Sequence, residues 1–164
     1  MNASSELRVV TAQESDASEL AKVKTGYAEQ NVAERFRWLK QKEEGAWLLL
    51  KNKKECIGWC VVVWSGKPTH PECPDIQDLF IKPEHRNQGY GTHLLHEAER
   101  LARERDYTQI GLAVNPDENR PALRLYKRLG YHHDGGEKYL DGVYGEYEDW
   151  VIDLKKDLIP ASDA

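Results

Sequence analysis

Residues 75–114 constrain the fold of this chain more than any other segment. An apolar run at residues 75–81 leads into a turn that carries Gly89 and Gly91, and a long amphipathic stretch follows as far as Tyr107. Apolar residues recur in this stretch every three to four positions, which is typical of a helix packed on one side. A second apolar run lies at residues 109–114. A strand, a helix and a strand in this order predict two parallel strands.

The other periodicities predict a mixed α/β fold with about four helices. Asp16 is expected to cap a first helix that ends near residue 29, and a second helix over residues 32–44 is expected to end at Gly45. A fourth helix over residues 121–129 would end at Gly130. Strands are expected at residues 7–11, 47–51, 57–64, 75–81, 109–114 and 146–154, with a weaker one at 137–140. The order predicts a twisted mixed sheet of six to seven strands with hairpins beside a parallel central pair.

Length and composition indicate one domain over residues 1–164, with a core at about 7–158 and irregular ends. The net charge of −5 argues against nucleic acid or an anionic membrane surface as a partner, since both need a basic footprint. The longest apolar runs are too short to span a bilayer. Three cysteines without a C-x-x-C motif or a signal peptide predict a reduced, cytoplasmic protein.

The glycine-bearing turn has the chemistry of a phosphate site. A turn at a helix N-terminus presents several backbone N–H groups, and Gly89 and Gly91 would let an anion approach that backbone without a Cβ in the way. Thr92 would add a hydroxyl. Neither the P-loop pattern nor the third glycine of the dinucleotide fingerprint is present. The alternative is that both glycines only form a tight turn before a core helix, and their spacing does not separate the two.

A second motif follows one strand later, and the two motifs together are more specific than the glycine-bearing turn alone. The strand ends Leu79-Phe80-Ile81, the turn reads Arg86-Asn87-Gln88-Gly89-Tyr90-Gly91, and the later segment supplies Asn119, Ala122, Leu125, Tyr126, Gly130 and Tyr131. Together these segments resemble the acetyl-CoA-binding core of the GNAT N-acetyltransferase family and cover about a third of the chain. Asn87 departs from the family pattern, in which glycine is common at this position.

The resemblance implies the GNAT fold, acetyl-CoA as co-substrate and no metal. In that fold the strand of residues 75–81 separates from the strand of residues 109–114, and pantetheine lies between them. Backbone groups of Leu79 and Ile81 would bind pantetheine, an amide near Phe80 would hold the thioester oxygen, and Asn119 would bond the cofactor arm. The pyrophosphate would bind the turn formed by Arg86, Asn87, Gln88, Gly89, Tyr90, Gly91 and Thr92.

The resemblance also assigns catalytic roles. Tyr126 would be the general acid for the thiolate, although transfer from a phenol of pKa about 10 to a thiol of about 8.5 is uphill and a hydrogen bond would give similar help. The alternative for Tyr126 is a half-buried helix aromatic. Asp75 or Asp78 is the candidate base, while Gln77 departs from polyamine-type members, and a water chain is a third route. On a regular strand Asp75 and Asp78 face opposite sides unless a bulge intervenes.

We therefore expect an N-acetyltransferase whose acceptor, a primary amine of a small molecule, attacks acetyl-CoA directly. The alternatives are a protein lysine or N-terminal acetyltransferase and a non-catalytic acyl-CoA sensor, and the resemblance also allows a homodimer. Histidines at positions 93, 96, 132 and 133 are expected at the surface rather than on a metal. The resemblance suggests an acceptor groove with negative charge beside it, bordered by Trp38, Trp64, Tyr139, Tyr144, Glu137, Asp141 and Glu146. The alternative, which the residues themselves favour slightly, is an ordinary solvated hairpin with scattered aromatic side chains.

Overall fold

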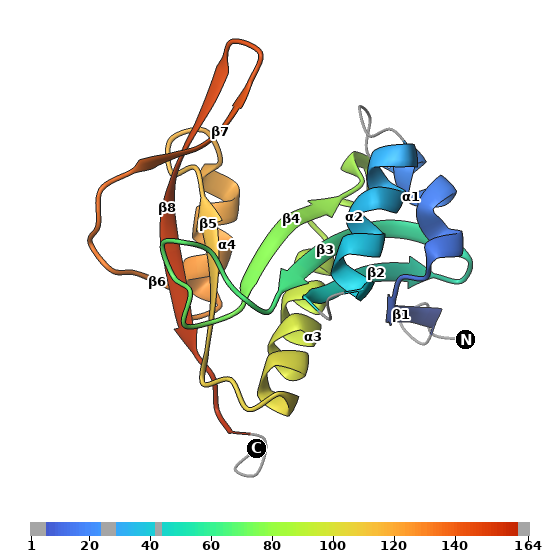
Figure 1. Cartoon of the computed structure of the whole chain (residues 1–164), viewed down its shortest axis with the longest axis horizontal. Helices are drawn as coiled ribbons and strands as arrows, with labels where there is room; N and C mark the ends of the chain where they lie inside the picture. Colours follow the sequence, from blue (N-terminus) through green and yellow to red (C-terminus); the bar gives the residue numbers. More distant parts are fainter. Residues whose placement is uncertain (1–5, 24–28, 42–43, 161–164) are drawn as a thin grey trace.

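The computed structural model describes residues 6–23, 29–41 and 44–160 (Figure 1). Among these residues, no helix is long and apolar enough to cross a membrane. Its elements, in chain order, are β1 (Leu7–Thr11), η2 (Glu14–Asp16), α1 (Ala17–Val23), α2 (Glu29–Gln41), β2 (Gly45–Asn52), β3 (Glu55–Val63), β4 (Asp75–Ile81), η3 (Pro83–His85), α3 (Tyr90–Glu104), β5 (Gln109–Val114), α4 (Arg120–Arg128), β6 (His132–His133), β7 (Tyr139–Tyr144) and β8 (Tyr147–Asp157).

The strands form one mixed sheet in the order β1-β2-β3-β4-β5-β8-β6, and β7 pairs with β8. Every pairing is antiparallel except that of β4 with β5. These two strands pair only at Asp75 with Gly111 and at Ile76 with Leu112. Beyond that point β4 leans toward α2 while β5 stays beside β8 (Figure 1). The predicted mixed sheet with a separating parallel pair is therefore confirmed.

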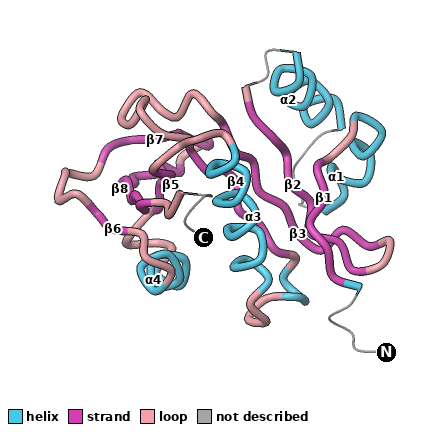
Figure 2. The backbone as a smooth tube through the Cα atoms, turned by 90° about the horizontal axis from the view of Figure 1, so that it is seen from below, coloured by secondary structure: helices cyan, strands magenta, loops and turns pink. Residues whose placement is uncertain are grey.

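Helices cover both faces of the β1–β4 part of the sheet. Leu48 and Leu50 of β2 join the core cluster that includes the apolar face of α3, whereas Trp47 and Leu49 join the cluster under α1 and α2. Figure 2 shows α1 and α2 together on one side of these strands and α3 on the other. Because alternate residues of β2 are buried on opposite faces, the strand reads as a continuous apolar run.

The boundaries differ from the predictions at the N-terminal helices. Asp16 ends the short turn η2 and α1 begins after it, while residues 24–28 lie outside the described residues. The second helix begins at Glu29, three residues before the predicted start. The prediction that Gly45 ends this helix is wrong, because Gly45 opens β2. A Cβ at that position would lie 2.0 Å from the carbonyl oxygen of Val62, so the pairing with β3 requires a glycine.

The C-terminal part is close to the prediction and contains one additional short strand. Gly130 follows α4 with a φ of +98°, the left-handed backbone that glycine adopts at helix ends. His132 and His133 form the two-residue strand β6 on the edge of β8, and both are exposed as expected. Such a short strand has no periodicity to detect in the sequence.

Candidate active site

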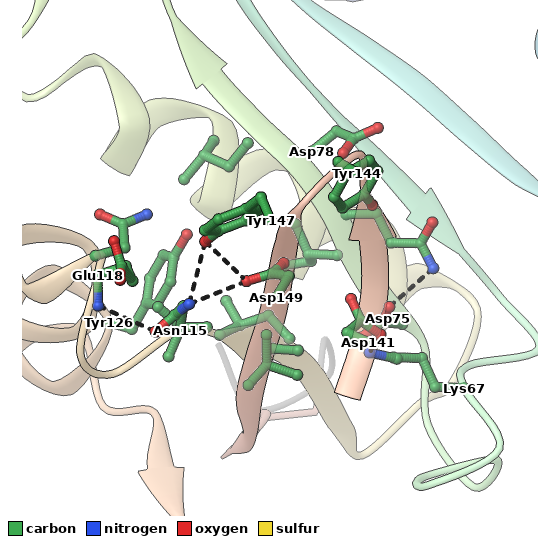
Figure 3. A pocket seen from close by; sticks show the side chains of 18 of the residues that line it. Lys67, Asp75, Asp78, Asn115, Glu118, Tyr126, Asp141, Tyr144, Tyr147 and Asp149 are labelled. Atoms are coloured by element: carbon green, nitrogen blue, oxygen red, sulfur yellow. Dashed lines mark hydrogen bonds and ion pairs between the residues drawn. The ribbon is translucent and has the colours of Figure 1, made fainter. Parts of the chain in front are cut away.

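A pocket of about 810 Å³ opens where β4 and β5 separate (Figure 3). This volume lies within the range of small-molecule sites. Its walls come from α2, β4, β5, α4, the loop before β4 and the hairpin of β7 and β8. The lining residues are Arg35, Lys67, Asp75, Ile76, Gln77, Asp78, Leu79, Leu112, Ala113, Val114, Asn115, Glu118, Asn119, Tyr126, Asp141, Tyr144, Tyr147, Asp149 and Val151.

A bulge in β4 brings both candidate carboxylates to this pocket. The pairing of β3 with β4 shifts register between Trp59 and Val61, and Asp78 has a φ of +52°. Aspartate tolerates this left-handed conformation better than most residues. The strict alternation that would place Asp75 and Asp78 on opposite faces is therefore broken, and both line the pocket.

Each of these carboxylates already has partners among the neighbouring side chains. Asp75 is buried, with Oδ1 2.9 Å from Nε2 of His70, and its Oδ2 accepts a hydrogen bond of 2.9 Å from Gln77. Asp78 forms an ion pair with Arg35, which also donates to Gln77 at 2.9 Å. These contacts hold both carboxylates in place at the pocket, and the role of either one as a base stays a prediction.

Tyr126 enters the pocket from α4 and is only 7% exposed. Burial raises the pKa of its phenol well above the ordinary value, and the ring meets Tyr131 edge to face at 6.1 Å. Among the described residues, its hydroxyl has no hydrogen-bond partner. The phenol thus stays protonated at working pH and is free to donate a hydrogen bond. The raised pKa makes full proton transfer to a thiolate harder than for a free tyrosine.

Asn119 lies at the start of α4, on the same side of the pocket as Tyr126. It is the N-cap of the helix, and its Oδ1 accepts a bond of 3.4 Å from the backbone N–H of Ala122. This bond uses the amide oxygen and not the amide nitrogen. Asn119 lines the pocket, and its role toward a cofactor stays a prediction.

The glycine-bearing turn follows β4 after the short helix η3. Asn87 and Gly89 have φ values of +63° and +80°, and α3 begins at Tyr90 without a side-chain cap among the described residues. The first N–H groups of a helix have no partner within the helix, and its dipole favours an anion there. A Cβ added to Gly89 would have no atom within 4 Å, so this backbone is open to approach. The Arg86 side chain is used locally, because Nε donates to the Ile81 carbonyl at 2.9 Å.

The profile of the Acetyltransferase (GNAT) family matches residues 12–131, most of the chain and all of the turn just described. The chain belongs to the GNAT family. Among curated relatives, an uncharacterized N-acetyltransferase of Methanocaldococcus jannaschii is 30% identical over 98 residues, which are 58% of this chain and 43% of the relative. The thialysine N-epsilon-acetyltransferase of Bos taurus is 34% identical over 67 residues, 41% of this chain and 36% of that protein. This GNAT chain thus spans less than half the length of these relatives.

Solved GNAT structures share the fold over nearly the whole chain. The spermidine/spermine N-acetyltransferase of Vibrio cholerae superposes with a TM-score of 0.74 at 16% identity, covering 94% of either chain. A phosphinothricin acetyltransferase of Sinorhizobium meliloti, solved with acetyl-CoA, gives 0.75 at 15% identity and covers 97% of this chain and 92% of its own. At such identities the likeness shows the fold.

The hairpin side of this GNAT pocket was only partly predicted. Tyr144 and Asp141 line it as expected, but Trp64 is buried in the core, where it stacks on Tyr107 at 6.0 Å. The prediction for Trp64 is therefore wrong. Trp38, Tyr139, Glu137 and Glu146 are also absent from the lining.

Six polar pocket residues outside the recognised motifs were not predicted: Arg35, Lys67, Asn115, Glu118, Tyr147 and Asp149. Asn115 donates to Asp149 and to the Tyr147 hydroxyl, each at 3.2 Å. Asn115 and Glu118 follow the carboxyl end of β5. Ligand sites commonly form at the carboxyl ends of strands that separate, so this position could have marked both residues as pocket candidates. Asp149 and Tyr147 come from β8 and Lys67 from the loop before β4, and no sequence pattern marks them.

Proposed function

We propose that this protein is an N-acetyltransferase that moves the acetyl group of acetyl-CoA to a primary amine of a small molecule. The observation that carries the proposal is that Asp75, Tyr126 and the part of β4 beyond its pairing with β5 meet in one pocket, near a helix N-terminus that has no side-chain cap among the described residues. Membership in the GNAT family supports the same reaction. Relatives whose names specify thialysine and spermidine as acceptors support a small cationic amine.

The separated strands fit an extended cofactor arm. Within the described residues, positions 77–81 of β4 have no paired position on β5. We assign the backbone of Leu79, Phe80 and Ile81 to this arm, because an extended ligand can bond a strand edge as an added strand would. The pyrophosphate would bind the open N–H groups between Asn87 and Thr92.

The charges of the pocket favour a cationic acceptor. Its lining contains five carboxylates and only two basic side chains, and Arg35 and Lys67 are each already paired with one of the carboxylates. We therefore assign Asp75 to holding the acceptor ammonium, and the ammonium loses its proton to water. Asp78 is already paired with Arg35 and would add only to the surrounding negative charge. Glu118 and Asp149 have no ion-pair partner among the described residues and would extend the attraction toward the hairpin.

Transfer then proceeds with two contributions from the chain. The neutral nitrogen attacks the thioester carbon, the carbon–sulfur bond breaks, and coenzyme A leaves as a thiolate that takes up, through water, the second proton lost by the nitrogen. A backbone amide near Phe80 would stabilise the charge that develops on the carbonyl oxygen. Tyr126 would donate a hydrogen bond to the sulfur as it leaves, in keeping with its raised pKa.

The test is acetyl transfer by the purified full chain. Acetyl-CoA is supplied with thialysine, spermidine or a lysine-containing peptide, and both thiol release and the acetylated product are measured. We expect transfer to a small amine. Transfer to the peptide alone would instead show a protein acetyltransferase. Binding of acetyl-CoA without transfer to any amine would contradict the enzyme assignment and favour a sensor.

A further inference from the structure

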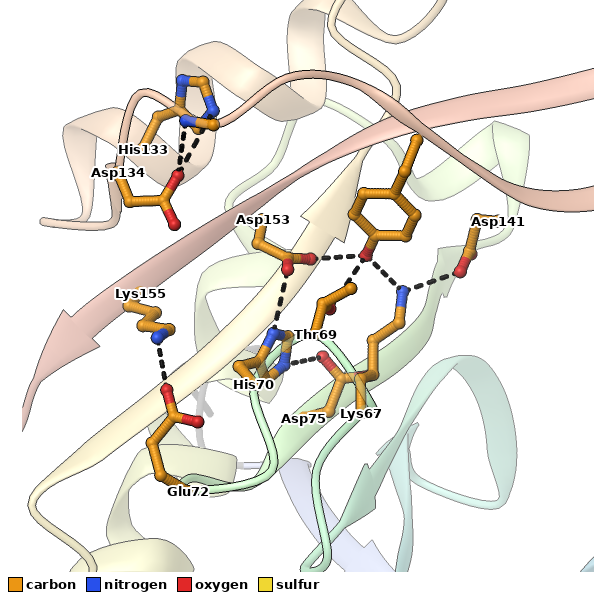
Figure 4. Close-up of polar contacts among 12 residues, drawn as sticks. Lys67, Thr69, His70, Glu72, Asp75, His133, Asp134, Asp141, Asp153 and Lys155 are labelled. Atoms are coloured by element: carbon orange, nitrogen blue, oxygen red, sulfur yellow. Dashed lines mark hydrogen bonds and ion pairs between the residues drawn. The ribbon is translucent and has the colours of Figure 1, made fainter.

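A completely buried histidine lies directly behind the pocket (Figure 4). His70 belongs to the loop before β4 and is 0% exposed. Its Nε2 lies 2.9 Å from Oδ1 of Asp75, and its Nδ1 lies 3.3 Å from Oδ2 of Asp153 on β8. The ring covers Gly111 of β5, where an added Cβ would lie 3.0 Å from Nε2. His70 thus joins three strands at the point where β4 and β5 begin to separate.

The contacts continue from His70 through Asp153 to a second carboxylate of the pocket lining. The Tyr139 hydroxyl donates to Asp153 at 2.6 Å, and the ammonium of Lys67 donates to Tyr139 at 2.8 Å and to Asp141 at 2.7 Å. Asp75 and Asp141 line the pocket, whereas His70, Tyr139 and Asp153 do not.

The surroundings of His70 favour its charged form. Burial lowers the pKa of an imidazole, but the bonds to Asp75 and Asp153 outweigh burial and raise the pKa of His70 above its ordinary value. For Asp153 burial acts in the other direction and raises the pKa of the carboxyl. Bonds from Thr69, Tyr139 and His70 outweigh it and lower the pKa of Asp153 below its usual range. The other titratable groups that act on this cluster are Lys67, Asp141, Glu72, Cys73 and Lys155.

We propose that His70 is a positioning residue, an imidazolium that holds the Asp75 carboxylate in place at the pocket and thereby sets the affinity for a cationic acceptor. This inference rests on the proposed function. His70 does not line the pocket, so it acts through Asp75. Without it, Asp75 would face the partly buried Asp153 across the same space, with neither a donor nor a positive charge between the two carboxylates.

Substitutions can separate the charge from the hydrogen bonds. In His70→Gln the amide nitrogen can take the place of Nε2 and still donate to Asp75, but the positive charge is lost. In His70→Asn the shorter amide can reach only toward Asp153. We expect the KM for thialysine or spermidine to rise about ten- to a hundredfold in His70→Asn and less in His70→Gln, with the Kd for acetyl-CoA unchanged. The acid limb of kcat/KM should also move to higher pH.

A merely structural histidine would not produce this pattern. Equal KM values and equal pH profiles in the wild type and both variants would overturn the proposal. If neither variant folds, the protonation state of His70 in the wild-type protein still tests the proposal. Nitrogen NMR of ¹⁵N-histidine-labelled protein across a pH titration should show the His70 ring losing its proton at a higher pH than free histidine, and a ring that loses its proton at the same or a lower pH would overturn the proposal. This readout needs no acceptor, so it stands apart from a failure of the proposed acetyl transfer.

Discussion

Asp75 pairs with Gly111 across the two parallel strands, one residue before β4 and β5 separate. The same aspartate is the first residue of β4 and lines the pocket, whereas the glycine leaves room for the His70 ring on its surface. The opening of the sheet and the polar end of the pocket therefore depend on one crowded junction. Substitutions that enlarge a side chain at this junction should therefore destabilise the fold.

Gly111→Ala should destabilise the fold. The added Cβ would lie 3.0 Å from Nε2 of His70, a buried ring that its hydrogen bond to Asp75 and its ion-pair contact with Asp153 leave little freedom to shift. We expect the free energy of unfolding, measured with urea, to fall by about 1–3 kcal/mol, the usual cost of overpacking.

Gly91→Ala is the matched control for Gly111→Ala. Gly91 lies in α3, and a Cβ added to it would make an ordinary contact of 3.6 Å with Leu125 of α4. This substitution should raise stability by about 0.5–1 kcal/mol, because alanine favours a helix over glycine. Stabilisation by both substitutions would show that His70 does not constrain β5.

Tyr126→Phe should lower kcat without weakening the binding of acetyl-CoA. Loss of the hydroxyl removes the donor to the leaving sulfur, and we expect a fall of about ten- to a thousandfold in steady-state turnover. Tyr131→Phe is the control, since its hydroxyl donates to the buried Glu99 at 2.9 Å and should matter for stability rather than rate. Unchanged turnover in Tyr126→Phe would remove Tyr126 from the mechanism.

Asn87→Asp should weaken acetyl-CoA binding through charge alone. Asn87 already has a φ of +63°, which aspartate also tolerates, so the new carboxylate is added at the anion site with little change in shape. We expect the Kd to rise about tenfold, with a stronger effect at low salt. Asn87→Gly keeps the backbone and adds no charge, and it should bind like the wild type. Equal affinity in all three proteins would place the pyrophosphate elsewhere.

The motif segments were predictable because their structure is local. The bounds of β4 and β5 match the prediction, and the two motifs indicated both the family and the separation of these strands. Other features depend on distant contacts. Gly45 forms a strand because Val62 lies against it, and His70 is buried because β4, β5 and β8 close around a proline-bearing loop. The homodimer and the cytoplasmic location stay predictions.

The stability that His70 contributes should depend on pH with a definite sign. A histidine whose pKa is raised on folding contributes fully below about pH 6.5, its ordinary unfolded value, and the contribution is lost as pH rises through the folded value. The free energy of unfolding of the wild type minus that of His70→Gln should therefore be constant near pH 5.5 and fall toward alkaline pH. Urea titrations across this range give the difference, and a difference that grows with pH would contradict a buried imidazolium.

Calorimetric titration of the full chain with acetyl-CoA tests the central claim most directly. The separated strands and the helix N-terminus should together give a Kd in the micromolar range, about −8 kcal/mol. Adenosine diphosphate, which reaches only the turn, should bind more weakly. Gly89→Asp should abolish acetyl-CoA binding, while Gly89→Asn, of similar shape and no charge, should retain most of it. A wild-type protein that binds neither acetyl-CoA nor a longer acyl-CoA would contradict the assignment of this site to acetyl transfer.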